Sequence, residues 1–262
     1  MIDYEIGLYK ELIEFCNERS NDIEKKFSVS LSFSELNEAC YKEMFYNCRH
    51  ISEPLPVKHF KEIIPGLDEA YKVNASKYLS PRYKYIKGYD IQKGDWYEKA
   101  LSLFLKTKGL DANKKGFPYP DFEVQKDGKI VGYYELKYIE SPFIYASTKM
   151  KNTYPYSKRY DYEASLTLDT GSKMAKQRER IEELLSDGVP VHFLWWFDCF
   201  HIKGLFAMSA QDVFEYYDNL EGDVWKRAER EGDTEDKQVH TKIYPPLLNM
   251  MTFSEYLSFL KK

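Results

Sequence analysis

The chain has 262 residues, 43% of them apolar and 31% charged, and a formal net charge of −4. This length can bury one large core, with or without a smaller extension, and the overall charge excludes a protein that binds nucleic acid through net basicity. No apolar run approaches the roughly 20 residues of a membrane span, Asp3 and Glu5 come before any apolar run, and the four cysteines form no CxxC pair. We therefore expect an intracellular, cytoplasmic protein with reduced cysteines and no membrane partner.

The first 90 residues have mostly helical patterns. Three helical segments are expected: residues 6–16, a helix that follows the capping-box pair Ser32 and Glu35, and a broken helix over 60–79. We divide the chain into a helical N-terminal region, 1–90, and a core with a C-terminal extension, 91–262. The N-terminal region could serve in recognition, in dimerisation or as a cap on the core.

The core is expected to begin with a helix over residues 95–105, with Asp95 as its candidate N-cap and Gly109 just past its end. A strand, a turn and a second strand follow over residues 122–134. Asp127-Gly128 predicts a two-residue hairpin turn, because glycine tolerates the positive φ that such turns need. The long polar connection over 140–169 is typical of a functional loop.

The remaining elements alternate between helices and strands. They are expected as a helix over 172–186 stopped by Gly188, a strand over 191–197, a strand over 202–208, a helix capped by Ser209 and Asp212, a strand over 241–244, and a helix capped by Thr252 with Glu255. The 191–197 strand is apolar on both faces, as in a sheet covered on both sides; within it, His192 is expected to be a core histidine with satisfied hydrogen bonds. The order predicts an α/β core with a central mixed sheet flanked by helices.

The expected hairpin brings three charged residues to one place. Side chains on a strand alternate between faces, so Glu135 and Lys137 point the same way, and the turn folds Asp121 back towards them. Two carboxylates and an ammonium group can hold a divalent metal ion and activate a water molecule. The other interpretation of Glu135 and Lys137 is an ion pair on an edge strand.

Basic residues concentrate on both sides of this hairpin in the sequence. Residues 71–94 carry six basic residues against one acidic, and residues 146–180 carry eight against four. A locally basic cleft in an acidic protein suits a polyanion. Four polar residues of the 172–186 helix share one face, and either contact phosphates or form a solvated face: Lys173, Lys176, Gln177 and Arg180.

Pro120-Asp121, followed by Glu135-Leu136-Lys137 at the end of an apolar strand and then by a helix and a strand, resembles the PD-(D/E)xK nuclease superfamily. The resemblance covers roughly residues 94–208 and implies the restriction-endonuclease-like fold. It implies Asp121 and Glu135 as Mg²⁺ ligands, with Mn²⁺ able to substitute, and Lys137 as the catalytic lysine. It also implies the backbone oxygen of Leu136 as a ligand.

Two further residues are candidates through the same resemblance. Many family members add a glutamate from the helix before the motif, and Glu98 stands there; its alternative role is a favourable interaction with the helix dipole in a first turn. Some lineages use a glutamine on the helix after the motif, where Gln177 stands. Ile181 breaks the QxxxY pattern of the exonuclease-type branch.

The function that this resemblance implies is Mg²⁺-dependent hydrolysis of DNA phosphodiester bonds. A type II restriction enzyme that cuts double-stranded DNA at a specific sequence, as a homodimer, fits the length and the long insertion. The alternatives are a structure-specific or nonspecific nuclease of repair, recombination or viral origin, and a catalytically silent DNA-binding protein of the same fold.

Overall fold

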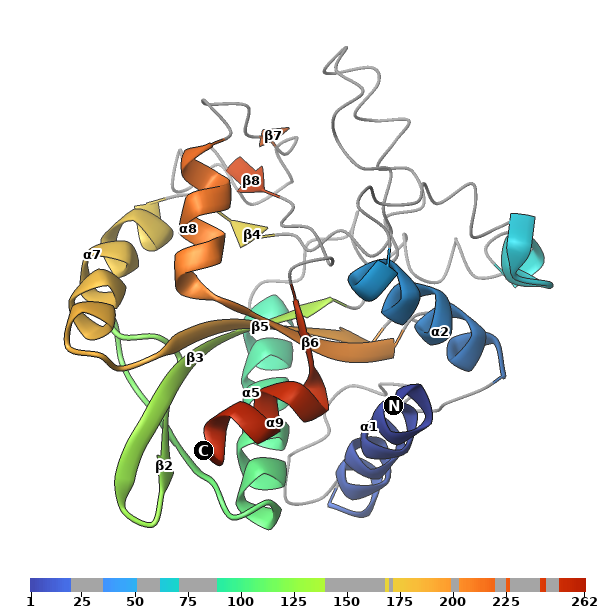
Figure 1. Ribbon diagram of the computed structural model, residues 1–262, viewed down its shortest axis with the longest axis horizontal. Helices are drawn as coiled ribbons and strands as arrows, with labels where there is room; N and C mark the ends of the chain where they lie inside the picture. The colour runs from blue at the N-terminus through green and yellow to red at the C-terminus, as the bar shows by residue number, and fades with distance from the viewer. Residues whose placement is uncertain are drawn as a thin grey trace.

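A six-stranded mixed sheet forms the centre of this computed structural model, with strand order β1-β2-β3-β5-β6-β9 (Figure 1). Its strands are β1 (Asp111–Lys114), β2 (Phe122–Lys126), β3 (Lys129–Ile139), β5 (Val191–Asp198), β6 (Lys203–Ser209) and β9 (Met251–Thr252). The structure describes residues 1–19, 35–50, 62–70, 89–139, 168–169, 172–198, 203–219, 225–226, 241–243 and 250–262.

Helices and a small second sheet complete the described residues. The helices are α1 (Ile2–Glu18), α2 (Glu35–His50), α5 (Tyr89–Thr107), α7 (Ser172–Ser186), α8 (Ala210–Asp218) and α9 (Phe253–Leu260). The second sheet has the order β4 (Leu168–Asp169), β8 (Thr241–Ile243) and β7 (Trp225–Lys226). Within the described ranges, no helix combines the length and apolarity needed to cross a membrane.

The large sheet is mixed because of one parallel pair. Strands β3 and β5 run parallel, whereas the pairs β1–β2, β2–β3, β5–β6 and β6–β9 are antiparallel. Parallel neighbours need a crossover connection, and α7 lies in the crossover between β3 and β5. The predicted central mixed sheet with flanking helices and a helical N-terminal region is therefore confirmed.

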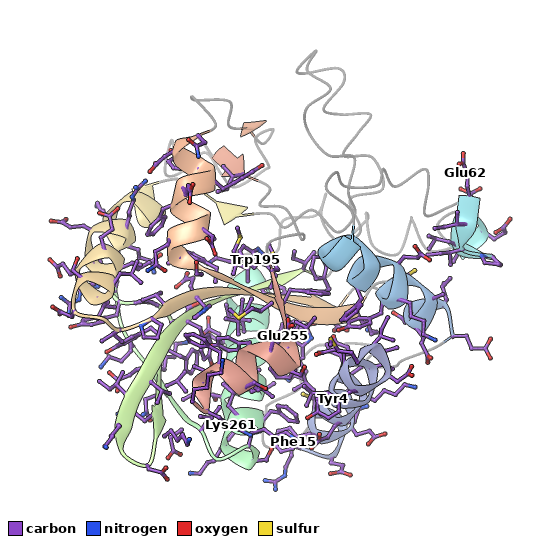
Figure 2. All side chains as sticks on the ribbon, viewed as in Figure 1. Tyr4, Phe15, Glu62, Trp195, Glu255 and Lys261 are labelled. Carbon is purple, nitrogen blue, oxygen red and sulfur yellow. The ribbon has the colours of Figure 1, made fainter. Side chains whose placement is uncertain are left out.

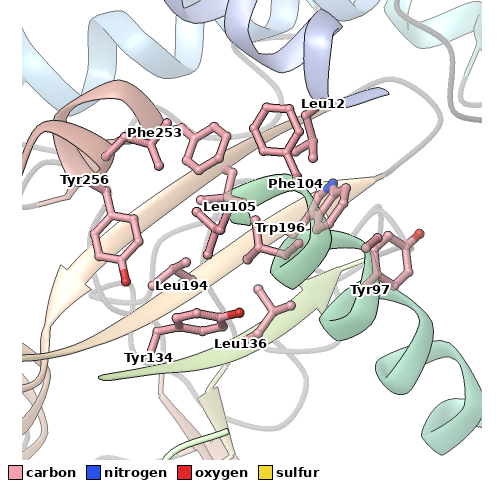
Figure 3. Close-up of a cluster of buried hydrophobic side chains, with 14 of the residues drawn as sticks. Leu12, Tyr97, Phe104, Leu105, Tyr134, Leu136, Leu194, Trp196, Phe253 and Tyr256 are labelled. Atoms are coloured by element: carbon pink, nitrogen blue, oxygen red, sulfur yellow. The ribbon is translucent and has the colours of Figure 1, made fainter. Parts of the chain in front are cut away.

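Each face of the sheet is covered by helices and has its own apolar cluster. The first cluster joins α2, α7 and α8 to one face, and the second joins α1, α5 and α9 to the other (Figures 1 and 3). Trp195 belongs to the first cluster and Trp196 to the second, and both are fully buried. All eight residues of β5 are buried, which confirms the prediction of a strand covered on both faces. Side chains fill both sides of the sheet around Trp195 (Figure 2).

The predicted hairpin is confirmed together with its turn chemistry. Asp127 and Gly128 have φ values of 52° and 75°, and Lys126 pairs with Lys129 across the turn. A bulge shifts the register between Val124 and Gln125. Beyond it the strands pair Phe122 with Tyr134, and this register sets which residues meet at the open end of the hairpin.

Several local signals proved accurate. Helix α7 has the predicted bounds, and Gly188 follows it with a φ of 77°. Ser209 caps α8 by accepting a hydrogen bond from the Asp212 backbone N–H at 3.1 Å, and Thr252 with Glu255 forms a capping box on α9.

One capping prediction is wrong. Helix α5 begins at Tyr89, so Asp95 lies inside it and is no N-cap, and Glu98 is not in a first turn. Ser32, residues 140–167 and most of the 60–79 segment lie outside the described residues; of the last, residues 62–70 contain short helical turns.

The N-terminal helix α1 packs into the second apolar cluster with α5 and α9. Leu12 lies there beside Phe104 and Phe253 (Figure 3). This packing agrees with a cap more than with a separate unit, and α5 runs across the boundary at residues 90 and 91. The division into two regions stays a prediction.

Candidate active site

Asp121 and Glu135 face each other at the open end of the β2–β3 hairpin. Because Phe122 pairs with Tyr134, the residue before β2 lies opposite Glu135. Each carboxylate accepts a hydrogen bond from the backbone of the other strand segment: the Asp121 N–H donates to Glu135 Oε2 at 3.1 Å, and the Leu136 N–H donates to Asp121 Oδ2 at 2.8 Å. These bonds fix both carboxylates at the open end of the hairpin.

Lys137 joins this pair from the same strand face, as alternation predicts. Its Nζ donates to Glu135 Oε1 at 2.6 Å. The side chain of Glu135 is 1% exposed, whereas that of Lys137 is 29% exposed. The ammonium group is therefore held by a buried carboxylate and still reaches solvent, and an exposed edge-strand ion pair does not describe this arrangement.

Asp121 is a half-buried acid beside the buried carboxylate of Glu135. Burial, followed by the neighbouring Glu135 carboxylate, raises the pKa of Asp121 to about 7, although Lys137 lowers it and Glu98 adds to the rise. Burial and a like charge both disfavour the ionised form. A cation bound between the two carboxylates would remove this penalty.

Gln177 lies inside the candidate site and not on an exposed face. It is 5% exposed, and its Nε2 donates to Glu135 Oε2 at 3.2 Å and to the Tyr119 backbone oxygen at 3.4 Å. Helix α7 thus contacts the catalytic candidate Glu135 through the Gln177 side chain. The sequence places Gln177 on one helix face with three basic residues, and its burial separates it from the exposed Lys176.

The basic residues of that face lie in different surroundings. Lys176 is exposed, and Lys173 lies in the first turn of α7. The guanidinium of Arg180 lies 4.3 Å from the centre of the Tyr119 ring, and its Nη1 pairs with Glu183 at 2.5 Å. Contact of these residues with DNA stays a prediction.

Glu98 approaches the site from α5 without joining the two other acids in a three-ligand group. Its carboxylate pairs with Lys114 of β1 at 2.8 Å, and Lys114 also pairs with Asp95 at 2.7 Å. Across the described ranges, no three or more His, Cys, Asp or Glu residues surround a common point. Glu98 as a metal ligand stays a prediction.

The donor set that the structure does bring together fits Mg²⁺. This ion prefers hard oxygen ligands and keeps several waters, so it is bound through one or two carboxylates. Asp121 and Glu135 supply these carboxylates, and a bound cation would relieve the electrostatic repulsion between them. The backbone oxygen of Leu136, between Glu135 and Lys137, stays a predicted further ligand.

The loop from residue 115 to 120 was missed as part of the site. It is closed by the Lys115 N–H, which donates to the Asp121 backbone oxygen at 2.8 Å, and Tyr119 within it contacts both Gln177 and Arg180. The available signal was the sequence Gly116-Phe117-Pro118-Tyr119-Pro120, two aromatic residues among turn formers directly before the first acid.

Comparisons with known proteins give little beyond this geometry. No protein-family model matches the chain, and no curated protein matches it. A solved structure that it resembles is the 1.6 Å structure of Archaeoglobus fulgidus Hjc, a Holliday junction resolvase from an archaeal hyperthermophile, at 14% identity and a TM-score of 0.35, covering 63% of this chain and 96% of that one. A likeness this weak supports no conclusion, so the residues of the site must carry the functional interpretation.

Proposed function

We propose that this chain is a PD-(D/E)xK-type nuclease that hydrolyses DNA phosphodiester bonds with Mg²⁺. The observation that carries the proposal is the meeting of Asp121, Glu135 and Lys137 at the open end of one hairpin, with the Lys137 ammonium 2.6 Å from Glu135 and still open to solvent. The same three residues are those that the sequence motif assigns to the chemistry.

The residues have complementary roles in this reaction. Asp121 and Glu135 would hold the ion, which when bound acts as a Lewis acid on the phosphate and lowers the pKa of a bound water. Lys137 donates hydrogen bonds at Nζ, so it can orient the attacking water or stabilise charge that develops on the phosphate oxygens. Gln177 and the Asp121 N–H fix the Glu135 carboxylate, so that little reorganisation is needed when substrate arrives.

We infer a type II restriction enzyme as the more specific form of this function, acting on double-stranded DNA as a homodimer, with Mn²⁺ able to replace Mg²⁺. A structure-specific nuclease is the second candidate, and one observation favours it: Phe117, next to the site, is 60% exposed. A catalytically silent DNA-binding protein is disfavoured, since binding DNA without cleaving it does not require two carboxylates held together against their electrostatic repulsion.

The test is plasmid DNA incubated with the protein and Mg²⁺, or with EDTA. The expected result is Mg²⁺-dependent cleavage, lost by at least about 10³-fold in Asp121→Ala and in Lys137→Ala, since each removes a group that acts on the reacting phosphate. Lys126→Ala, a lysine of the same hairpin away from the site, is the matched control and should cut normally.

The products separate the two candidates. Discrete fragments indicate a restriction enzyme, and nicking or smearing indicates a structure-specific or nonspecific nuclease. Full cleavage by a folded Asp121→Ala protein, or no cleavage by the unmodified chain with either Mg²⁺ or Mn²⁺, contradicts the proposal.

A further inference from the structure

The loop over residues 115–120, named here the aromatic loop, presents an exposed ring beside the candidate site. Phe117 is 60% exposed, and the loop is held by two backbone bonds, from the Lys115 N–H to the Asp121 oxygen and from the Tyr119 N–H to the Gly116 oxygen at 3.1 Å. Single exposed apolar side chains are common on proteins. Here the position matters, because the ring projects from a fixed loop that ends at the first candidate metal ligand.

Tyr119 and Lys115 of the loop form a layer of aromatic and basic groups with residues of β3 and α7. The Tyr119 ring stacks on Tyr133 with 6.0 Å between centres and 27° between planes. Arg180 lies 4.3 Å from its centre, and Lys115 Nζ lies 5.3 Å from it. This combination of π faces and cations is what single-stranded nucleic acid uses, since bases stack on the rings and phosphates pair with the cations.

The aromatic loop is tied to the catalytic candidates through Gln177. One amide nitrogen of Gln177 donates both to the Tyr119 backbone oxygen and to Glu135 Oε2. Phe117 is four residues from Asp121, so their Cα atoms are at most about 14 Å apart. A nucleotide held at the loop therefore lies close to a phosphate held between Asp121 and Glu135.

Salt bridges do not block the two cations of this layer. Lys115 pairs with Glu123 at 3.3 Å and Arg180 with Glu183 at 2.5 Å, and the side chains of both cations are about a third exposed, at 33% and 29%. The Arg180–Glu183 pair is exposed and contributes little free energy, and Glu123, which is only 10% exposed, keeps hydrogen bonds from Gln125 and Tyr133 when Lys115 turns away. A DNA phosphate can therefore replace a carboxylate partner at small cost.

From these contacts we infer that the aromatic loop binds an unstacked nucleobase next to the scissile phosphate, with Phe117 as the stacking face and Lys115 and Arg180 beside the adjacent phosphate. This inference rests on the proposed nuclease function and specifies its substrate: DNA with a nucleotide out of the helical stack. That nucleotide comes from a single-stranded segment, or it is extruded from a duplex on binding.

The test is binding of oligonucleotides that carry 2-aminopurine, measured by fluorescence with Ca²⁺ in place of Mg²⁺. Three probes are compared: a single strand, a duplex with an unpaired flap, and a fully paired duplex. Phe117→Ala should weaken binding to the first two by about tenfold, the value expected for the loss of one base–aromatic stack. Phe117→Leu, which keeps apolar surface but no ring, should lose as much, and the exposed Ile130→Ala on the same hairpin should lose nothing.

The two possible sources of the nucleotide give different results. A wild-type fluorescence change on the flap without any on the paired duplex assigns the unpaired segment as the source, and an increase on the paired duplex, where neighbouring bases quench the probe, assigns extrusion. Unchanged affinity in Phe117→Ala, or an equal loss in Ile130→Ala, overturns the inference even if plasmid is still cut. Stacking that depends on Phe117 without any Mg²⁺-dependent cleavage would instead overturn the nuclease function and leave the binding surface standing.

Discussion

Two lysine–carboxylate pairs on neighbouring strands differ in the solvent exposure of the lysine, and this difference distinguishes a structural pair from a candidate catalytic one. Lys203 and Asp198 pair between β6 and β5, with side chains 1% and 0% exposed. Lys137 and Glu135 pair within β3, with the glutamate equally buried and the lysine 29% exposed. The same two types of charged group are thus enclosed in one place and open to solvent in the other.

Their surroundings explain the difference. Asp198 also accepts a hydrogen bond from the Tyr97 hydroxyl at 2.5 Å, so one carboxylate is matched by one lysine and a neutral donor. Glu135 has Asp121 beside it as a second acid. A matched pair closed to water can only hold the fold together. Two acids beside an accessible ammonium group differ, because the carboxylates can bind a cation and the ammonium group can bind a phosphate.

The largest expected effect is on the enclosed pair. Lys203→Met leaves Asp198 buried without its cation, so we expect the free energy of unfolding to fall by about 3–5 kcal/mol. Urea denaturation followed by circular dichroism measures it. Lys137→Met is the comparison variant and should cost less, because Glu135, although equally buried, keeps hydrogen bonds from the Asp121 N–H and from Gln177. Equal losses in both variants would remove the distinction between the pairs.

The buried imidazole of His192 should respond to acid. His192 lies near the start of β5, between Tyr256 and Phe259 at 5.2 Å and 4.8 Å between ring centres, and its Nδ1 has no hydrogen-bond partner among the residues that the structure describes. The expectation of a satisfied core histidine is therefore wrong for this atom. Burial lowers the pKa of His192 to about 4, against a small opposing effect of Asp212.

The sign of the pH effect follows from that pKa. Between about pH 4 and the ordinary value of 6.5 the unfolded chain binds the proton and the folded chain does not, so stability falls as pH is lowered through this window, by up to about 3 kcal/mol. Urea titrations at several pH values measure it. His192→Leu should have a shallower slope between pH 6.5 and 4; an unchanged slope would mean that His192 is protonated in the folded protein.

The sequence predicted those features that depend on neighbours along the chain. Asp127-Gly128 and Gly188 identify backbone positions that need positive φ, and strand alternation was enough to place Lys137 beside Glu135. The start of α5 was missed because Asp95 has the residue type of a cap but the helix extends back to Tyr89. Residue type alone does not reveal whether a preceding turn is already helical.

Contacts between distant segments could not be predicted in this way. Gln177 meets Tyr119 across 58 positions of sequence, and the contact depends on how α7 packs against the sheet. The pairing of Glu98 with Lys114 similarly depends on α5 lying against β1. Helical spacing places Lys176, Gln177 and Arg180 near one another on α7, but only packing determines which of them turns inward.

The smallest expected effect is an increase in stability, whereas most mutations lower the free energy of unfolding. Asp121→Asn keeps an oxygen to accept the Leu136 N–H and removes the charge that repels Glu135, so without metal we expect stability to rise by about 1–2 kcal/mol. Thermal unfolding in EDTA measures this change. The same substitution at Asp127, exposed in the hairpin turn, is the control and should change little.

Mg²⁺ supplies the second half of this test. The wild-type melting temperature should rise with Mg²⁺ concentration, because the ion binds the folded chain, and Asp121→Asn should lose most of that rise while Asp127→Asn keeps it. A variant at Asp121 that is less stable than wild type in EDTA would show that this carboxylate holds the hairpin together. The open pair would then be structural like the enclosed one, and the contrast between Glu135–Lys137 and Asp198–Lys203 would reduce to solvent access alone.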